Sequence, residues 1–389
     1  MSMRDVVIVG AGPAGLHLAA RLGAAGLDVT VLEAQARVGE RVVCSGVIGE
    51  EAFQRFDLPT ETVCSTFRRI QAVSPRGAVL DYSAELPLAR VVHKADFNRA
   101  LAARAESAGA EIATGRRVES FAIERDGVTV GLRLLPDNRR EELRARFAVL
   151  AVGVGNAFSQ SLGLCRPAEY LQGVQVDVDL PDASPDEPTR VFVGRSVAPG
   201  GFAWSIPLEP GRWRLGLMTT DGPLPYFQRF LERVAPSLDP AALKPSHKPI
   251  GQLPRGRTVA ERLLAVGEAA GHVKTSTGGG IFYGLLGAEL AAETIARAFR
   301  TGSFAAHTLA EYERGWRRAF GKELQVGHSA RKMGACLRDS HIERIFNVVQ
   351  SSDLLARVNG RLRFDWHQAA LLAMMRNLIS VPGLFRETR

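Results

Sequence analysis

Cysteine is scarce in this chain, and its few cysteines form no binding motif. The four residues, Cys44, Cys64, Cys165 and Cys336, stand far apart and include no Cys-x-x-Cys pair. Zinc sites and disulfide frameworks need closer or more regular spacing, so the sequence predicts neither, and we expect no metal site. Because isolated thiols suit a reducing compartment, a cytoplasmic location is the simplest interpretation.

Long hydrophobic runs are also missing. No apolar stretch reaches the ~20 residues that a transmembrane helix needs, and the N-terminus leads directly into a strand rather than into a signal pattern. With 389 residues, of which 46% are apolar, and a mean hydropathy near zero, the chain is typical of a soluble protein of two or three packed units.

Acidic residues are in the minority, and the formal net charge is +8. The arginines are spread along the chain and alternate with acids, so we do not expect nucleic-acid binding. A basic protein is also attracted to anionic lipid surfaces and to phosphorylated substrates. The apolar segment from Trp366 to Phe385 either docks on the body of the protein or rests on a lipid surface as a peripheral membrane contact. Docking is the favoured interpretation.

Glycine, in contrast, is abundant, and its first cluster follows an apolar strand near the N-terminus. The sequence Gly10-Ala-Gly12-Pro-Ala14-Gly15 opens a helical stretch, and a second strand ends at Glu33. Gly10 permits a tight turn, Gly12 lets the backbone approach a pyrophosphate, and Gly15 lets the helix pack close to the strand. Glu33 stands where an acid binds the adenosine ribose. The pattern predicts dinucleotide binding, with Ala14 among the contacts.

A second glycine cluster follows the apolar strand at 262–266. An acid next to the first of these glycines can bind ribityl hydroxyls, and glycine amides at the start of a helix can face a flavin ring or a phosphate. Together the two clusters predict FAD rather than NAD. The cofactor contacts expected here are Gly267, Glu268, Gly278, Gly279, Gly280 and Ile281.

The order of the predicted elements indicates an α/β protein. It has a Rossmann-like FAD-binding domain, a mostly antiparallel β-sheet substrate domain and a helical C-terminal part. The elements expected are a helix at 50–56, a hairpin at 67–82, a β-meander within 111–152, and long strands at 171–179, 189–195, 202–206 and 212–220. The domains expected are FAD-binding (1–65, 93–165 and 257–300), substrate (66–92 and 166–256) and helical C-terminal (301–389).

Two further segments carry a resemblance to a known family. They are the loop Cys44-Ser-Gly46 and the sequence Phe202-Ala-Trp204-Ser-Ile206-Pro207, with Gly216 downstream. With the two glycine clusters, they resemble the geranylgeranyl reductase family of flavoproteins, which has the p-hydroxybenzoate hydroxylase fold. The resemblance covers essentially the whole chain.

Some positions depart from the family pattern. Glu268 replaces the usual Asp, Lys94 stands where the family has Arg, and Asn98 stands where it has Asp.

The resemblance implies saturation of isolated C=C bonds in isoprenoid chains, by hydride transfer from N5 of reduced FAD. It also implies roles for particular residues. Cys44 and Trp204 become the catalytic candidates, and Cys44 also lies beside the flavin; Arg41 and Lys94 become cofactor contacts. The substrate-binding candidates are Phe202, Trp204, Ile206 and Tyr283. For each of these side chains, plain packing or solvation is the alternative, and for His272 a structural role is favoured over proton donation.

Other functions stay open at this point. An FAD-dependent monooxygenase or halogenase of the same fold would act on a small aromatic or polyketide substrate, and a halogenase would need a lysine in the N-terminal part. Lys94 is the sole lysine before Lys244, and it fits the family's cofactor-contacting site better. A non-catalytic flavin-binding protein is disfavoured by the near-complete cofactor motifs.

The electron donor is also left open. No second complete GxGxxG unit is present for NADPH, because Gly153-Val-Gly155 lacks the third glycine. The donor is therefore either NADPH bound transiently or a protein partner such as ferredoxin or another reductase, and the substrate is a hydrophobic small molecule or lipid.

Overall fold

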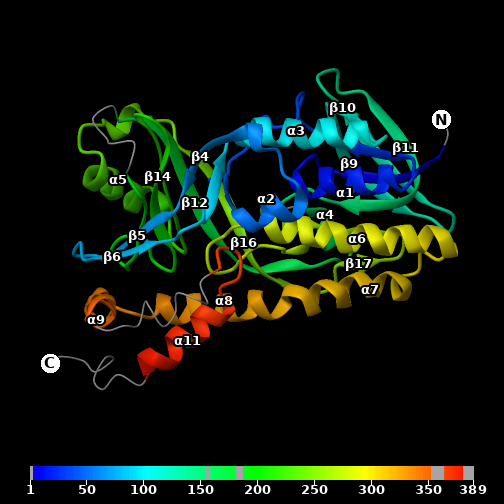
Figure 1. Ribbon diagram of the computed structural model, residues 1–389. Helices are drawn as coiled ribbons and strands as arrows, with labels where there is room; N and C mark the ends of the chain where they lie inside the picture. Colours follow the sequence, from blue (N-terminus) through cyan, green and yellow to red (C-terminus); the bar gives the residue numbers. More distant parts are fainter. Residues whose placement is uncertain (1–2, 155–156, 181–186, 352–362, 380–389) are drawn as a thin grey trace.

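The largest parts of the protein are two β-sheets, the helices that pack on them and a group of C-terminal helices (Figure 1). The computed structural model describes residues 3–154, 157–180, 187–351 and 363–379. A sheet of eight strands carries the N-terminal glycine turn, and a sheet of seven strands stands beside it, on the left in Figure 1. The predicted α/β class is confirmed. The segment Gly153-Val-Gly155 lies only partly within the described residues.

The eight-stranded sheet is built around β1 (Arg4–Val9), which pairs in parallel with β2 (Val29–Leu32) and β11 (Arg140–Leu150). Residues 6–9 of β1 are all buried. A parallel strand that is covered on both faces needs such a continuous apolar run. The other strands along this sheet are β17 (Val259–Ala260), β18 (Leu263–Ala265) and β8 (Glu111–Ala113).

Helices cover one face of this sheet, and an antiparallel hairpin covers the other. Val6 and Ile8 pack against the helices, whereas Val7 and Val9 pack against the hairpin. The predicted β-meander is confirmed, because the two hairpin strands and β11 pair in succession. The hairpin strands are β9 (Arg116–Ile123) and β10 (Val128–Leu134), and the helices include α1 (Pro13–Ala24), α3 (Lys94–Ser107), α6 (Ile281–Thr301) and α7 (Ala306–Trp316).

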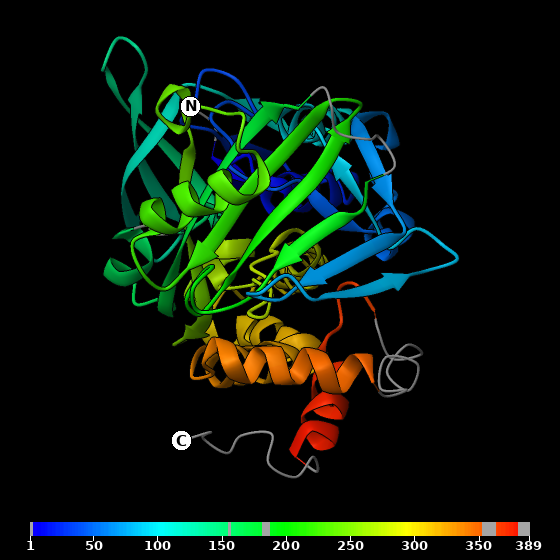
Figure 2. The same ribbon diagram turned by 90° about the vertical axis from the view of Figure 1, so that its left-hand side faces the viewer.

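The seven-stranded sheet is antiparallel except for one pair of strands, as the sequence predicted. Its strands in spatial order are β16 (Ser246–Arg255), β12 (Arg166–Asp179), β15 (Arg212–Thr219), β14 (Phe202–Glu209), β13 (Thr189–Phe192), β5 (Arg69–Val73) and β6 (Val79–Ser83). Figure 2 shows this broad sheet with α5 (Pro223–Val234) across it. Trp213, Leu215 and Leu217 alternate along β15 and pack with α5, so the side chains between them belong to the opposite face.

Two elements of this sheet layer were not predicted from the sequence. β16 contains Pro249 and Pro254, which argue against a central strand. It lies at the edge and pairs with β12, and an edge strand tolerates proline because some of its N–H groups have no ladder partner. Helix α5 begins at Pro223 and buries Phe227 and Phe230, a pattern short enough to be mistaken for a loop.

A small third sheet lies between the two large ones. Its strands are β3 (Val47–Gly49), β7 (Ala89–Val92) and β4 (Val63–Phe67). The predicted helix at 50–56 is confirmed as α2 (Glu50–Phe56). Phe67 and Val91 pack against Ile206 and Leu208 of β14, so the small sheet is attached to the inner face of the seven-stranded sheet.

The C-terminal part is helical, as predicted, within the described residues. Its helices after α7 are α8 (Lys322–Ala335), α9 (Asp339–Gln350) and α11 (Gln368–Ile379). Ala370 and Ala373 of α11 pack with Val349 of α9, which supports docking of this segment on the body; residues 380–385 of it lie outside the described part. Across the described ranges, no helix has the length and apolarity to cross a membrane. Shorter helical segments are α4 (Ala157–Ser161), η1 (Thr60–Thr62), η2 (Pro240–Ala242), η3 (Gly267–Ala270) and η4 (Arg317–Gly321).

His272 lies in the core that joins α6 to the C-terminal helices. Its imidazole is fully buried among the rings of Tyr312, Trp316 and Phe320, with centroid distances of 5.1–6.2 Å. Neither ring nitrogen has a hydrogen-bond partner among the described residues, so this is not the hydrogen-bonded position that such loops usually provide. Burial lowers the pKa of His272 to about 3.

We predict that replacing His272 with Leu makes the protein less sensitive to acid. In the unfolded chain the imidazole binds a proton below its ordinary pKa of about 6.5, whereas the folded protein keeps it neutral until about pH 3. The contribution of the neutral ring to the free energy of unfolding is therefore fully present above pH 6.5. Below pH 6.5 this contribution falls by about 1.4 kcal/mol per pH unit. Urea unfolding at pH 7 and pH 5 measures the difference. An equal loss in both proteins would contradict the prediction.

Candidate functional site

One cavity of about 740 Å³ lies between the two large sheets, a size typical of ligand sites. The two glycine clusters, far apart in the sequence, meet at this cavity. The inner face of the seven-stranded sheet forms another of its walls. The predicted site residues that line it are Gly10, Gly12, Ala14, Glu33, Cys44, Lys94, Phe202, Trp204, Ile206, Gly267, Glu268, Gly278, Gly279, Gly280 and Ile281.

The N-terminal glycine turn is close-packed on one side and open on the other. Gly10 has a φ of +107°, and a Cβ there would lie 2.5 Å from the carbonyl oxygen of Ala151. Gly15 lies behind the turn, where a Cβ would lie 2.3 Å from the carbonyl oxygen of Gly10. A Cβ on Gly12 would meet no described atom within 4 Å. Gly15 therefore allows α1 to approach the end of β1, Gly10 allows the turn to lie against Ala151, and Gly12 leaves the backbone accessible from the cavity.

Helices α1 and α6 both begin at this cavity with a glycine as N-cap, as does the short helix α2 at Gly49. Gly12 precedes α1, Gly280 precedes α6, and neither helix end is capped by a side chain. The first backbone N–H groups of a helix have no intrahelical partner and carry a partial positive charge. Two such ends at one cavity favour an anionic ligand such as a pyrophosphate.

Glu33 is fixed at the end of β2 by backbone donors. One carboxylate oxygen accepts from the N–H of Ala11 at 3.0 Å, and the other accepts from the N–H of Gln35 at 2.8 Å. The side chain thus braces the glycine turn and faces the cavity. Arg116 and Arg117 also line this end, although the sequence had not singled them out.

Three charged groups follow along the cavity wall. Lys248 of β16 forms an ion pair with Glu268, with the ammonium nitrogen 2.8 Å from a carboxylate oxygen. Lys94 is buried and donates to the side-chain oxygen of Asn98, four residues on along α3. Burial lowers the pKa of Lys94 to about 8, and the positive charge of Lys248 acts in the same direction.

The loop that carries Cys44 is held by the seven-stranded sheet. The Cys44 sulfur accepts from the N–H of Gly46 at 3.4 Å, and Gln175 donates to the carbonyl of Cys44 at 3.1 Å. Arg214 donates to the carbonyl of Ser45 at 2.6 Å. The guanidinium also binds Asp177, its direct neighbour across β12 and β15, through two contacts of 2.7 Å. Gln175 and Arg214, which hold this loop, were not predicted from the sequence, because nothing in the sequence links them to residue 44.

The register of the strands explains the apolar wall. Phe202, Trp204 and Ile206 alternate along β14 and share the face opposite α5. Trp204 pairs with Gly216 of β15, and a Cβ on Gly216 would lie 2.5 Å from the indole ring. The glycine therefore makes room for the indole to lie flat on the neighbouring strand. This accounts for the spacing of Trp and Gly in the sequence motif.

The structure does not bring every predicted residue to the cavity. Arg41 is exposed and is not among the lining residues, whereas its neighbours Glu40 and Val42 are. Tyr283 is only 1% exposed and lies in the core, where its hydroxyl donates to the backbone carbonyl of Asp365. Its position on the third residue of α6 turns it away from the cavity face.

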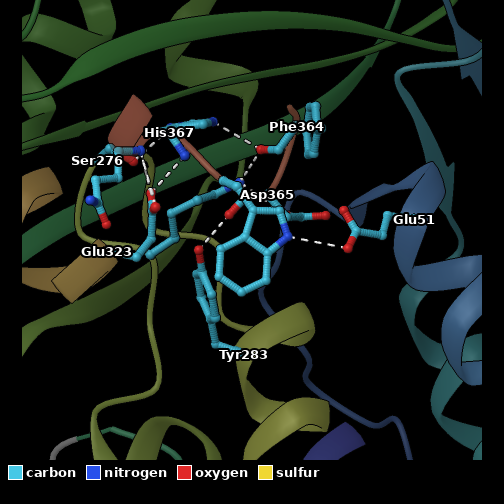
Figure 3. Close-up of polar contacts among 10 residues, drawn as sticks. Glu51, Ser276, Tyr283, Glu323, Phe364, Asp365 and His367 are labelled. Atoms are coloured by element: carbon cyan, nitrogen blue, oxygen red, sulfur yellow. Dashed lines mark hydrogen bonds and ion pairs between the residues drawn. The ribbon is translucent and has the colours of Figure 1, made fainter. Parts of the chain in front are cut away.

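A C-terminal segment that the sequence had not indicated closes part of the wall. Phe364, Asp365 and His367 line the cavity together with Arg363. Figure 3 shows this segment between Glu51 on one side and Ser276 and Glu323 on the other. We call residues 363–367 the strap.

Comparison with known proteins agrees with the fold and the cavity. A family model described as an FAD binding domain matches residues 3–324. Digeranylgeranylglycerophospholipid reductase 2 of Methanothermobacter thermautotrophicus is 30% identical over 365 residues, covering 90% of this chain and 92% of the relative. The digeranylgeranylglycerophospholipid reductase of Methanosarcina acetivorans is 26% identical over 400 residues, covering 98% and 96%.

Solved structures share the fold over nearly the whole chain. The crystal structure of a geranylgeranyl bacteriochlorophyll reductase-like protein from Thermoplasma acidophilum has a TM-score of 0.85 at 20% identity, covering 96% of both chains. The flavin-dependent halogenase CmlS has a TM-score of 0.70 at 19% identity, covering 98% of this chain and 78% of the halogenase.

The fold, the cavity and the family match define an FAD-dependent oxidoreductase. Among such enzymes, the chain belongs to the geranylgeranyl reductase family, as the sequence motifs had indicated. The cavity suits FAD for two reasons. The N-termini of α1 and α6, which have no side-chain caps, can bind phosphates. The carboxylates of Glu33 and Glu268 can accept hydrogen bonds from hydroxyl groups.

We predict that replacing Glu33 with Ala weakens FAD affinity at least tenfold. The change removes a charged acceptor, worth about 1.5–3 kcal/mol, and also releases the N–H of Ala11 in the glycine turn. Equilibrium dialysis of the apoprotein against FAD measures the effect. Glu33→Gln, which keeps one oxygen for Ala11, should lie between the two proteins. Equal affinity in all three would remove Glu33 from the site.

Proposed function

We propose that this protein is an FAD-dependent reductase that saturates C=C bonds of an isoprenoid lipid of the geranylgeranyl type. One observation carries the proposal: a single cavity joins two glycine-capped helix ends to an apolar wall around Trp204. The relatives named digeranylgeranylglycerophospholipid reductases support a lipid with such chains as the substrate.

We assign the polar end of the cavity to FAD. The N-terminus of α1 at Gly12 holds the pyrophosphate, Glu33 holds the adenosine ribose, and Glu268 holds the ribityl chain. Gly279 and Gly280 present backbone N–H groups at the start of α6. Lys94, whose ammonium has no ion pair in the described part of the chain, contacts the cofactor as well. When reduced, FAD supplies the hydride for the reaction.

We assign the apolar end to the isoprenoid chain. An isolated alkene is a weak electrophile, so its carbon must be held about 3–3.5 Å from the hydride donor. Phe202, Trp204 and Ile206 form a dry surface that can hold a hydrocarbon in one place and exclude water. Trp204 has the most restricted position, because its ring lies against Gly216.

We propose that Cys44 lies next to the reacting carbons and acts there as the proton donor. Cys44 lines the cavity, and its loop is fixed by Gln175 and Arg214. A thiol held in this way can supply the proton that saturation of the second carbon needs. We propose this role for Cys44, and substrate positioning for Trp204.

The partners follow from the substrate. We propose that the protein acts in the cytoplasm and touches a lipid surface transiently to collect its hydrophobic substrate. Its reducing equivalents come from NADPH or from a small electron-transfer protein such as ferredoxin, because the sequence holds no second nucleotide fingerprint.

An anaerobic assay tests the proposed activity. We predict that purified protein carries FAD, that dithionite reduces it, and that the reduced protein adds hydrogen to geranylgeranyl compounds without O₂. Mass spectrometry counts the hydrogens gained. Turnover that requires O₂ would instead favour a monooxygenase, and turnover that requires O₂ with halide would favour a halogenase, a class with which the chain shares its fold.

We predict that Trp204→Ala lowers the rate of alkene reduction by about tenfold to a hundredfold while FAD stays bound. Misplacing a reacting group by ~1 Å has an effect of this size. Single-turnover reoxidation of the reduced flavin by geranylgeraniol measures the rate, and absorbance at 450 nm measures retained FAD. Trp204→Phe should restore part of the rate. Loss of FAD in the alanine variant would show that Trp204 supports the cofactor end instead.

A further inference from the structure

The strap of residues 363–367 is held at the cavity from several sides. Trp366 donates to Glu51 of α2 at 3.2 Å, and the backbone N–H of His367 donates to Glu323 of α8 at 2.6 Å. The His367 ring bonds to Ser276 at 2.8 Å. Figure 3 shows these contacts around Asp365 and Phe364, so the strap is held by α2, by α8 and by the loop that contains Ser276.

Lys274 makes the central contacts to the strap. It lies in the loop that leads to the three glycines, and it is 4% exposed. Its ammonium donates to the carbonyl of Phe364 at 2.6 Å and to the carboxylate of Asp365 at 3.1 Å, and it lies 4.7 Å from the centre of the Phe364 ring. One lysine thus fixes both the backbone and the ring of Phe364.

The ion pair is enclosed on its other sides as well. Tyr283 donates its hydroxyl to the backbone carbonyl of Asp365. The second carboxylate oxygen of Asp365 lies against Gly49, where a Cβ would approach it to 2.0 Å. Asp365 is 5% exposed, so the Lys274–Asp365 pair is a buried contact with little room to rearrange.

The ring of Phe364 reaches the apolar end of the cavity. It packs against the cluster that includes Phe67, Ile206 and Trp204, and its centroid lies 6.3 Å from that of Phe67. All four side chains line the cavity. Phe364 is therefore the residue of the strap that extends the apolar surface, which we assign to the hydrocarbon chain.

We propose that Phe364 is a specificity-determining residue, which limits the length of isoprenoid chain that the cavity accepts, and that Lys274 is the positioning residue that holds it there. This inference rests on the proposed function. A large ring fixed against a hydrocarbon surface excludes any atoms that would need its volume, and pockets of this kind discriminate about tenfold or more per methylene-sized change. Removing the ring widens the apolar end and leaves in place the hydrogen bond between Lys274 and the backbone carbonyl of residue 364.

The test compares two alcohols that differ by one isoprene unit, geranylgeraniol and geranylfarnesol. Phe364→Ala should raise the ratio of kcat/KM for the longer alcohol to that for the shorter one by about tenfold, and Phe364→Leu by less. Phe299→Ala, which removes a ring outside the cavity lining, should leave the ratio unchanged. An unchanged ratio in Phe364→Ala would overturn the proposal.

A double variant separates positioning by Lys274 from simple stabilisation. Removing one partner of a buried ion pair is strongly destabilising, but removing both is often tolerated, so Lys274→Met with Asp365→Asn is the suitable change. If Lys274 positions Phe364, the double variant should shift the chain-length ratio in the same direction as Phe364→Ala. A wild-type ratio with a lowered Tm would leave the pair a structural role only and overturn this part of the proposal.

Binding of a saturated analogue keeps the inference testable apart from turnover. The affinity of phytanol for the FAD-loaded protein is measured by the change in flavin absorbance, and Phe364→Ala should alter the ratio of its Kd to that of the next longer saturated alcohol. If the wild-type protein binds both alcohols but reduces no alkene, the proposed reaction fails while the Kd ratios still decide the role of Phe364. Equal Kd ratios in the wild-type and variant proteins would overturn that role.

Discussion

The organisation of the protein depends on two helix N-termini that face the same cavity without side-chain caps. Backbone N–H groups at a helix end need partners, and a ligand that supplies them gains both hydrogen bonds and a favourable dipole. Glycine at the N-cap of α1 and of α6 keeps these groups accessible. Gly15 permits the close approach of α1 to the glycine turn, and Gly10 permits that turn to lie against Ala151. Both helix ends line the cavity, so this end of it favours an anionic ligand.

The walls of the cavity come from four distant parts of the chain. The N-terminal part supplies the glycine turn and the Cys44 loop, and the central sheet supplies the apolar face. The second glycine cluster adds the start of α6, and the C-terminal strap closes one side. Arg214 and Lys274 join these parts, because each binds backbone carbonyls of a segment far from its own. Through such contacts, one part of the chain fixes the side chains that another part carries. A reaction between two bound molecules requires side chains that are fixed in this way.

Much of the polar half of the site could be predicted from the sequence, and less of the apolar half. Gly12 and Glu33 are readable because a local strand–turn–helix pattern fixes their roles. Trp204 was singled out by the resemblance of its segment and Gly216 to a family motif, and the structure shows why the two residues go together, because Gly216 leaves room for the indole. Phe364 and Lys274 could not be predicted, since their meeting depends on tertiary packing of helices. Tyr283 and Arg41 were expected at the cavity, but the direction of a side chain from a helix or loop is not encoded in a motif.

The position of the strap also has a consequence for where the boundary of a working unit can be drawn. Residues 363–367 form part of a wall whose other members begin at residue 9. They lie outside residues 3–324, which the FAD binding domain model matches. A fragment cut at residue 324 would lack Phe364 and would leave the buried ammonium of Lys274 without its two partners. The residues shared with the wider FAD-binding family therefore do not enclose this chamber by themselves.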